Sequence, residues 1–127
     1  MKQQVEVKEL KEGKYVVVDD EPCVIKSIAK SKPGKHGSAK ARIEAIGIFD
    51  GQKRSIISSV SAKTYVPIVE RKSAQVLSVS GDIAQLMDME DYSTLELNIP
   101  EQFKDRVVEG ADITYITAMG KMKIDLR

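Results

Sequence analysis

Short apolar runs separated by turn signals fill the first half of the chain. Residues 14–19 form one such run, and an acidic turn at residues 19–22 separates it from a second run at residues 23–29. Runs of this length, bounded by Asp and Pro, are typical of β-strands rather than helices. The pattern predicts two consecutive strands.

A strict alternation follows at residues 39–45, where Ala and Ile alternate with Lys40, Arg42 and Glu44. A period of two residues predicts a strand with one buried face and one wet, largely basic face. The apolar phase shifts around Gly47, and a glycine at a phase shift predicts a bulge or a sharp bend.

Two further strands complete the first half. Asp50-Gly51 is a signal for a two-residue turn, and apolar runs at residues 52–59 and 63–69 predict the strands that follow it. Together these elements predict a small β-barrel.

The second half also reads as strands. They are predicted at residues 74–79, 83–89, 94–99, 113–118 and 122–126. Pro100 opens a polar segment at residues 101–108 that Gly110 closes, which predicts one short helix. Five strands with a helix between the third and the fourth is the order of an OB-type barrel, a fold that often presents one face to nucleic acid.

Charge separates the two halves. The charged segment at residues 70–73 interrupts the apolar pattern and predicts a domain boundary, so that residues 1–69 and 70–127 form separate domains. The overall charge of +1 hides 13 Lys/Arg against 8 Asp/Glu in the first domain and 7 against 11 in the second. The net charges of +5 and −4 indicate that the first domain meets a polyanion.

The candidate functional residue is Lys35, within a predicted hairpin loop at residues 30–40. Pro33 fixes its own φ, while Gly34 and Gly37 can adopt positive φ, so the chain can reverse tightly around one long cationic side chain. A solvated turn is the simpler alternative. One-sided charge argues against it, because eight Lys/Arg at residues 26–54 face only two Asp/Glu.

Several enzyme classes are excluded by the residues present. His36 is the only histidine, which excludes histidine pairs and His-based metal triads. Lys35 on a solvated tip among other cations lacks the burial that activates a nucleophilic lysine. The glycines around it also lack the spacing of a phosphate-binding loop. We therefore expect no enzyme, no metal site and no small-molecule substrate.

The remaining signals favour ordinary structural positions. One cysteine, Cys23, forms no intramolecular disulfide and is expected in the core. The acidic residues of the second half are spread out, as on a solvated face, and are Asp82, Asp88, Glu90, Asp91, Glu96, Glu101, Asp105, Glu109 and Asp112. Core positions are expected for the methionines Met87, Met89, Met119 and Met122. No apolar run approaches the roughly 18 residues of a membrane span, and no leader precedes the domain, so a soluble cytoplasmic protein is expected.

The stretch SKPGKHGSAKARIEAIGIFDG resembles the modification loop of translation initiation factor 5A in its archaeal form. The resemblance extends over the whole chain and implies an N-terminal SH3-like barrel followed by a C-terminal OB barrel. It also implies that deoxyhypusine synthase transfers an aminobutyl group from spermidine to Lys35. Pro33 fits the archaeal pattern, and whether a hydroxyl then converts deoxyhypusine to hypusine is not readable from the sequence.

By the same resemblance, the protein binds the ribosome beside peptidyl-tRNA and helps poor substrates such as consecutive prolines to react. The modified side chain approaches the acceptor end of that tRNA, and no other cofactor is implied. The expected loop residues are Ser31, Lys32, Pro33, Gly34, His36 and Gly37. The expected phosphate contacts are Lys30, Lys40 and Arg42, which are otherwise solvated strand residues.

Two alternatives remain open. A general RNA-binding module would track phosphates with the basic hairpin and bind single strands on its OB face, usually by aromatic stacking. Aromatic content is 5%, and only Tyr92 and Phe103 look freely placed. Core positions are expected for Tyr15, Phe49, Tyr65 and Tyr115. A small assembly adaptor would not depend on Lys35.

Overall fold

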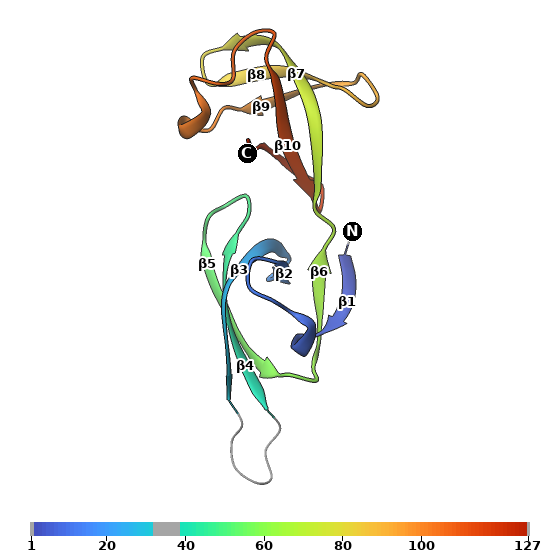
Figure 1. Ribbon diagram of the computed structural model, residues 1–127, viewed down its shortest axis with the longest axis vertical. Helices are drawn as coiled ribbons and strands as arrows, with labels where there is room; N and C mark the ends of the chain where they lie inside the picture. Colours follow the sequence, from blue (N-terminus) through green and yellow to red (C-terminus); the bar gives the residue numbers. More distant parts are fainter. Residues whose placement is uncertain (1, 32–38, 127) are drawn as a thin grey trace. The chain divides into compact units, whose positions relative to one another are not determined.

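The computed structural model describes residues 2–31 and 39–126 (Figure 1). It is almost entirely β-structure, which confirms the expected all-β class. The chain divides into two compact units, Met1–Ile68 and Val69–Arg127. The division falls between Ile68 and Val69, one residue before the predicted boundary after Val69. Each unit is described by itself.

Antiparallel strands build the first unit into two sheets. Strands β2, β3, β4 and β5 form one sheet in that order, and β1 pairs with β6 in the other. The elements are β1 (Lys2–Glu6), η1 (Val7–Glu9), β2 (Tyr15–Val18), β3 (Glu21–Ser31), β4 (Lys40–Gly47), β5 (Lys53–Ser59) and β6 (Lys63–Pro67). Their inward side chains form one core, which includes Val16, Ile25 and Ile43. Cys23 lies in it, as expected.

Strand β3 begins earlier than the sequence indicated. Glu21 and Pro22 belong to the strand, and Pro22 pairs with Val17 of β2. The turn before it is therefore short, and Asp19 and Asp20 make it with φ values of 52° and 61°. Asp tolerates this left-handed region better than most residues because its short side chain can hydrogen-bond to nearby backbone.

Of the two alternatives predicted at Gly47, a bulge or a sharp bend, the bulge is absent there, because the irregularity of the pairing lies in the neighbouring strand. The pairing of β3 with β4 shifts between Ile25 and Ser27, which leaves Lys26 as the extra residue. Residue 47 must instead be glycine because the side chain of Asp50 occupies the position of a Cβ atom. A Cβ built there would clash with the carboxylate of Asp50, which Arg54 holds through two hydrogen bonds of 3.1 and 2.8 Å.

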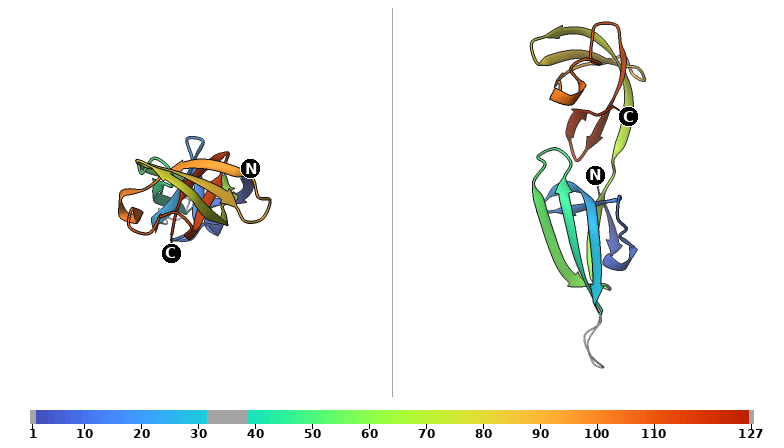
Figure 2. Two further views of the ribbon diagram at one scale, coloured as in Figure 1. Left: turned by 90° about the horizontal axis from the view of Figure 1, so that it is seen from above. Right: turned by 60° about the vertical axis from the view of Figure 1, so that its left-hand side comes forward.

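The second unit is a five-stranded antiparallel sheet in the order β11-β10-β7-β8-β9. Because β11 also contacts β9, the sheet curls into a nearly closed barrel, which Figure 2 shows from two further directions. The elements are β7 (Glu70–Ser80), β8 (Ile83–Asp88), β9 (Thr94–Asn98), η2 (Glu101–Phe103), β10 (Asp112–Ala118) and β11 (Lys121–Ile124). This is the predicted OB-type element order.

Two expectations about the second unit need correction. The charged segment at residues 70–73 forms the start of β7 and pairs with β10, so this strand begins four residues before the predicted residue 74. The charged Arg71 has a structural role in this strand, because its guanidinium donates hydrogen bonds to the side chain of Asp125 and to the hydroxyl of Thr114. The helix is only the three-residue 3-10 turn Glu101–Phe103.

The methionine and aromatic positions also differ from expectation. Met89 and Met122 are exposed and Met87 and Met119 half-buried, so the methionines lie outside the buried core. Among the aromatics, Tyr115 is buried as predicted and Tyr92 is exposed. The remaining outcomes are that Tyr15 and Tyr65 are exposed, that Phe49 is half-buried, and that Phe103 packs against the core.

Asp88 is not on a solvated face but is only 2% exposed. Its carboxylate accepts hydrogen bonds from the Tyr115 hydroxyl and from the backbone N–H groups of Glu90 at 2.8 Å and Asp91 at 3.2 Å. These donors, Tyr115 foremost, lower the pKa of Asp88. Burial and the Asp88 charge raise the pKa of Tyr115 in turn.

We predict that Asp88 makes the second unit sensitive to acid. A carboxyl with a lowered pKa in the folded state contributes stability above its unfolded pKa of about 4, and that contribution is lost as the pH falls through the folded value. Urea unfolding, monitored by hydrogen exchange, should show that the free energy of unfolding of the second unit falls below about pH 4. Asp88→Asn should lower stability at pH 7 and flatten this dependence. An equally steep acid dependence in Asp88→Asn would contradict the assignment.

Candidate functional site

The β3–β4 hairpin carries the candidate residues. Its strands pair up to Ser31 opposite Lys40, with Lys30 opposite Ala41 and Ala29 opposite Arg42. Ser31 is the last residue of β3 and is exposed. The segment at residues 32–38 connects these strands. Lys35, with Lys32, Pro33, Gly34, His36 and Gly37, lies outside the described residues.

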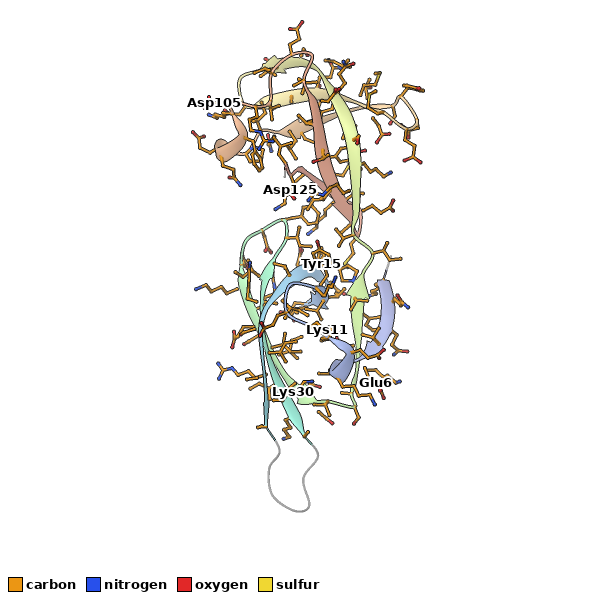
Figure 3. All side chains as sticks on the ribbon, in the orientation of Figure 1. Glu6, Lys11, Tyr15, Lys30, Asp105 and Asp125 are labelled. Carbon is orange, nitrogen blue, oxygen red and sulfur yellow. The ribbon has the colours of Figure 1, made fainter. Side chains whose placement is uncertain are left out.

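The three predicted phosphate contacts do not share one face. Paired residues in an antiparallel sheet point to the same side. Lys30 pairs with the buried Ala41, so it points to the core side of the sheet, although it is exposed near the end of β3 (Figure 3). Lys40 and Arg42 alternate with the buried Ala41 and Ile43 and point to the opposite side. The structure therefore brings Lys40 and Arg42 together and separates Lys30 from them.

We define the outer face as the side of strands β3, β4 and β5 that points away from the core. Figure 2 shows these strands side by side in its right-hand view. Register places the following residues on it: Val24, Ser27, Ala29 and Ser31 of β3, Lys40, Arg42, Glu44 and Ile46 of β4, and Lys53, Ser55, Ile57 and Ser59 of β5. All but Val24, Glu44, Ile46 and Ser59 are exposed.

Lys26 joins the outer face through the bulge. As the extra residue of β3 it is exposed, and it lines a shallow depression together with Glu44, Ile46 and Lys53. Two lysines from strands that do not pair with each other thus border one hollow. Both lysines belong to the basic stretch at residues 26–54, but nothing in the sequence marks them as neighbours. Their common position follows only from the register and the bulge.

Most of the cationic side chains on the outer face are not engaged in a described salt bridge. Among the described salt bridges only one involves it, between Arg42 Nε and Glu44 Oε1 at 2.9 Å. Both partners are well exposed, and an exposed pair of this kind contributes little stability. An arriving anion can therefore compete for Arg42.

Arg54 does not belong to this charged surface, although it is part of the same basic stretch of sequence. It pairs across β4–β5 with the buried Ala45, its side chain is only 15% exposed, and Asp50 holds it with a bidentate ion pair. The hydrogen bond from Arg54 to Asp50 is the main reason that its pKa is raised. Burial raises the pKa of the neighbouring Cys23 thiol.

No helix within residues 2–31 and 39–126 is long and apolar enough to cross a bilayer. Over the same residues, no three His, Cys, Asp or Glu side chains gather closely enough to hold a metal ion.

Two family models match the chain. The first, described as "Translation initiation factor 5A-like, N-terminal", matches residues 2–62. The second, described as "Eukaryotic elongation factor 5A hypusine, DNA-binding OB fold", matches residues 68–125. The second match agrees with the OB topology of the second unit.

Relatives of known name extend over the full length. The translation initiation factor 5A of Methanococcoides burtonii is 88% identical over 127 residues, which is 100% of both chains. That of Archaeoglobus fulgidus is 64% identical over 125 residues, 98% of each chain. These relatives are named as translation factors, not as enzymes.

Solved structures show the same fold. The eukaryotic translation initiation factor 5A from Methanococcus jannaschii has a TM-score of 0.91 at 47% identity, covering 98% of this chain and 92% of that one. A family protein from Naegleria fowleri has a TM-score of 0.79 at 37% identity, covering 98% and 96%.

Proposed function

The chain belongs to the translation initiation factor 5A family, and on that premise we propose that it acts on cytoplasmic ribosomes beside peptidyl-tRNA. Lys35, extended by an aminobutyl group that deoxyhypusine synthase adds from spermidine, approaches the acceptor end of that tRNA. It promotes peptide-bond formation at sequences such as consecutive prolines. The protein is not an enzyme in this proposal, because the ribosome performs the chemistry.

The observation that carries the proposal is the position of the Lys35 segment in the chain. Strands β3 and β4 are long, and they pair up to Ser31 and Lys40 on either side of that segment. A paired hairpin limits the conformations of both strands that lead to Lys35. Ordered strands at the base of a functional segment lower the entropy that is lost when the segment binds.

The aminobutyl group supplies reach. Lysine is a compact point charge on a four-carbon stem, while the extension adds length and a second protonatable nitrogen. Two separated charges suit phosphates along an RNA cleft. Holding the tRNA end and the nascent chain in a reactive geometry lowers the entropic part of the barrier without any bond to the factor.

A general RNA-binding module is the second candidate function. The exposed cations of the outer face and the OB topology of the second unit favour it. It differs from the first proposal in requiring no modification of Lys35. The two are separated by the chemical state of that one side chain.

Mass spectrometry of protein purified from its native host tests the proposal. A protease that cleaves after glutamate releases residues 13–44, because Pro22 blocks cleavage after Glu21. Fragment ions should place an aminobutyl increment on Lys35 and leave Lys30, Lys32 and Lys40 unmodified. An added oxygen would distinguish hypusine from deoxyhypusine. Bare lysine at residue 35 would refute the proposal and favour the general RNA-binding function.

A further inference from the structure

Strand β3 loses its neighbour on one edge before the hairpin ends. Strand β4 pairs along the other edge as far as Ser31, whereas β2 pairs with β3 only as far as Val24. Backbone hydrogen bonds extend this contact to Ile25, whose N–H donates to the carbonyl of Lys14 at 2.8 Å. None of the described strands pairs with this edge beyond that point. The end of the hairpin therefore has a neighbouring strand on β4 only.

The bulge lies where this support ends. Lys26 is its extra residue, between Ile25 and Ser27. A β-bulge interrupts the ladder and increases the local bend and twist, so it is the point at which the hairpin tilts most easily. Ser31 lies about 13 Å beyond Ser27 along the strand, and a tilt of about 10° at the bulge would move it by about 2 Å. The direction of the hairpin thus depends on what holds β3 just after the bulge.

One side chain holds β3 at that place. Glu12 Oε1 accepts a hydrogen bond from the N–H of Ile28 at 3.3 Å. Glu12 lies in the turn that follows Lys11, which Figure 3 labels, and Gly13 adopts the φ of 81° that the turn requires. The N–H of Gly13 donates to the carbonyl of Ile25 at 2.9 Å. This turn therefore spans the bulge, with backbone contacts before it and the Glu12 carboxylate after it.

We propose that Glu12 is a positioning residue, whose hydrogen bond to the N–H of Ile28 fixes the direction in which the hairpin presents Lys35. The inference rests on the proposed function, in which a partner must receive Lys35 at a defined place. The side chain of Ile28 already packs against the first core. The Glu12 bond restricts the rotation of β3 that this anchor still permits. A displacement of about 1 Å at a reacting group is enough to slow a reaction, so a tilt of the hairpin matters for modification.

Residual dipolar couplings of backbone amides test the direction of the hairpin in the full chain. In Glu12→Ala the couplings of Ala29 and Arg42 should be reduced relative to those of Val16 in the barrel. The free energy of unfolding should stay nearly unchanged, because Glu12 is exposed and water replaces the lost partner. Couplings in Glu12→Ala equal to those of the native chain would overturn the proposal.

Glu12→Gln is the matched control, because it removes the same charge and keeps an oxygen that accepts from the N–H of Ile28. It should show the couplings of the native chain. An equal reduction in Glu12→Gln and Glu12→Ala would also overturn the proposal, since charge rather than the hydrogen bond would then determine the direction of the hairpin.

Modification kinetics with deoxyhypusine synthase connect this direction to function. If only a fraction of hairpins point correctly, apparent affinity falls by that fraction, so KM for Glu12→Ala should rise by about threefold at unchanged kcat. Glu12→Gln should keep the native KM. An unchanged KM in Glu12→Ala, with or without a lower kcat, would overturn the proposal. Absence of modification in the native chain would refute the proposed function and leave the couplings to decide this inference, so the two fail separately.

Discussion

Lys35→Arg is expected to abolish function in cells while leaving the fold intact. Arginine keeps the positive charge and nearly the length of lysine, but its guanidinium does not accept the aminobutyl group. If the extension of Lys35 positions the tRNA end, charge alone does not replace it. A strain that carries only this variant should fail to grow, or should translate reporters with consecutive prolines at the rate of a strain without the factor.

Lys40→Arg is the matched control for this substitution. It makes the same chemical change a few residues along the hairpin, at a position where a phosphate contact needs only a cation. It should support normal growth and normal modification of Lys35. Normal growth of the Lys35→Arg strain would contradict the proposed function, and circular dichroism of both purified variants would exclude a folding defect as the cause.

Leu86→Ala is expected to cause one of the largest losses of stability available in the chain, and to do so in the second unit. Leu86 is 0% exposed and lies in the core that β7, β8 and β10 share. Removing most of a buried leucine side chain loses its transfer free energy and leaves a cavity, at a cost of about 2–5 kcal/mol. Hydrogen exchange should show lost protection in strands β7 to β11.

Ile43→Ala is the counterpart in the first unit, where Ile43 is also 0% exposed. It should cost a similar amount, about 2–5 kcal/mol, with lost protection in strands β2 to β5. The two buried clusters have no residue in common. Equal loss of protection in both units from either substitution would show that they unfold as one cooperative body.

Local patterns were sufficient to predict most of the strands. The alternation at residues 39–45 marked β4 correctly because one face of that strand is buried and the other is wet. The same reasoning failed at Gly47. Ile46 looked like a phase shift, but it continues the alternation as an apolar residue on the outer face, beside the depression.

Features that depend on distant partners were not predictable. The start of β7 at Glu70 was not predicted, because the carboxylate that pairs with the charged Arg71, that of Asp125, is 54 residues away. Asp88 looked solvated because its partner, Tyr115, is 27 residues away. The candidate site shows the same limit: sequence identified the cations, but only the bulge and the register separate Lys30 from Lys40 and bring Lys26 to Lys53.

The bulge in β3 also bears on which changes in chain length the protein can accept. Ile25 and Ile28 both point into the core, although they are three residues apart, because Lys26 is accommodated as an extra residue. A deletion of Lys26 would restore a regular strand without turning any later residue over. A deletion at Ala29 would instead reverse Lys30 and Ser31 relative to the sheet. At position 26 the hairpin can therefore lose one residue while the side chains that follow in β3 stay on the same faces of the sheet.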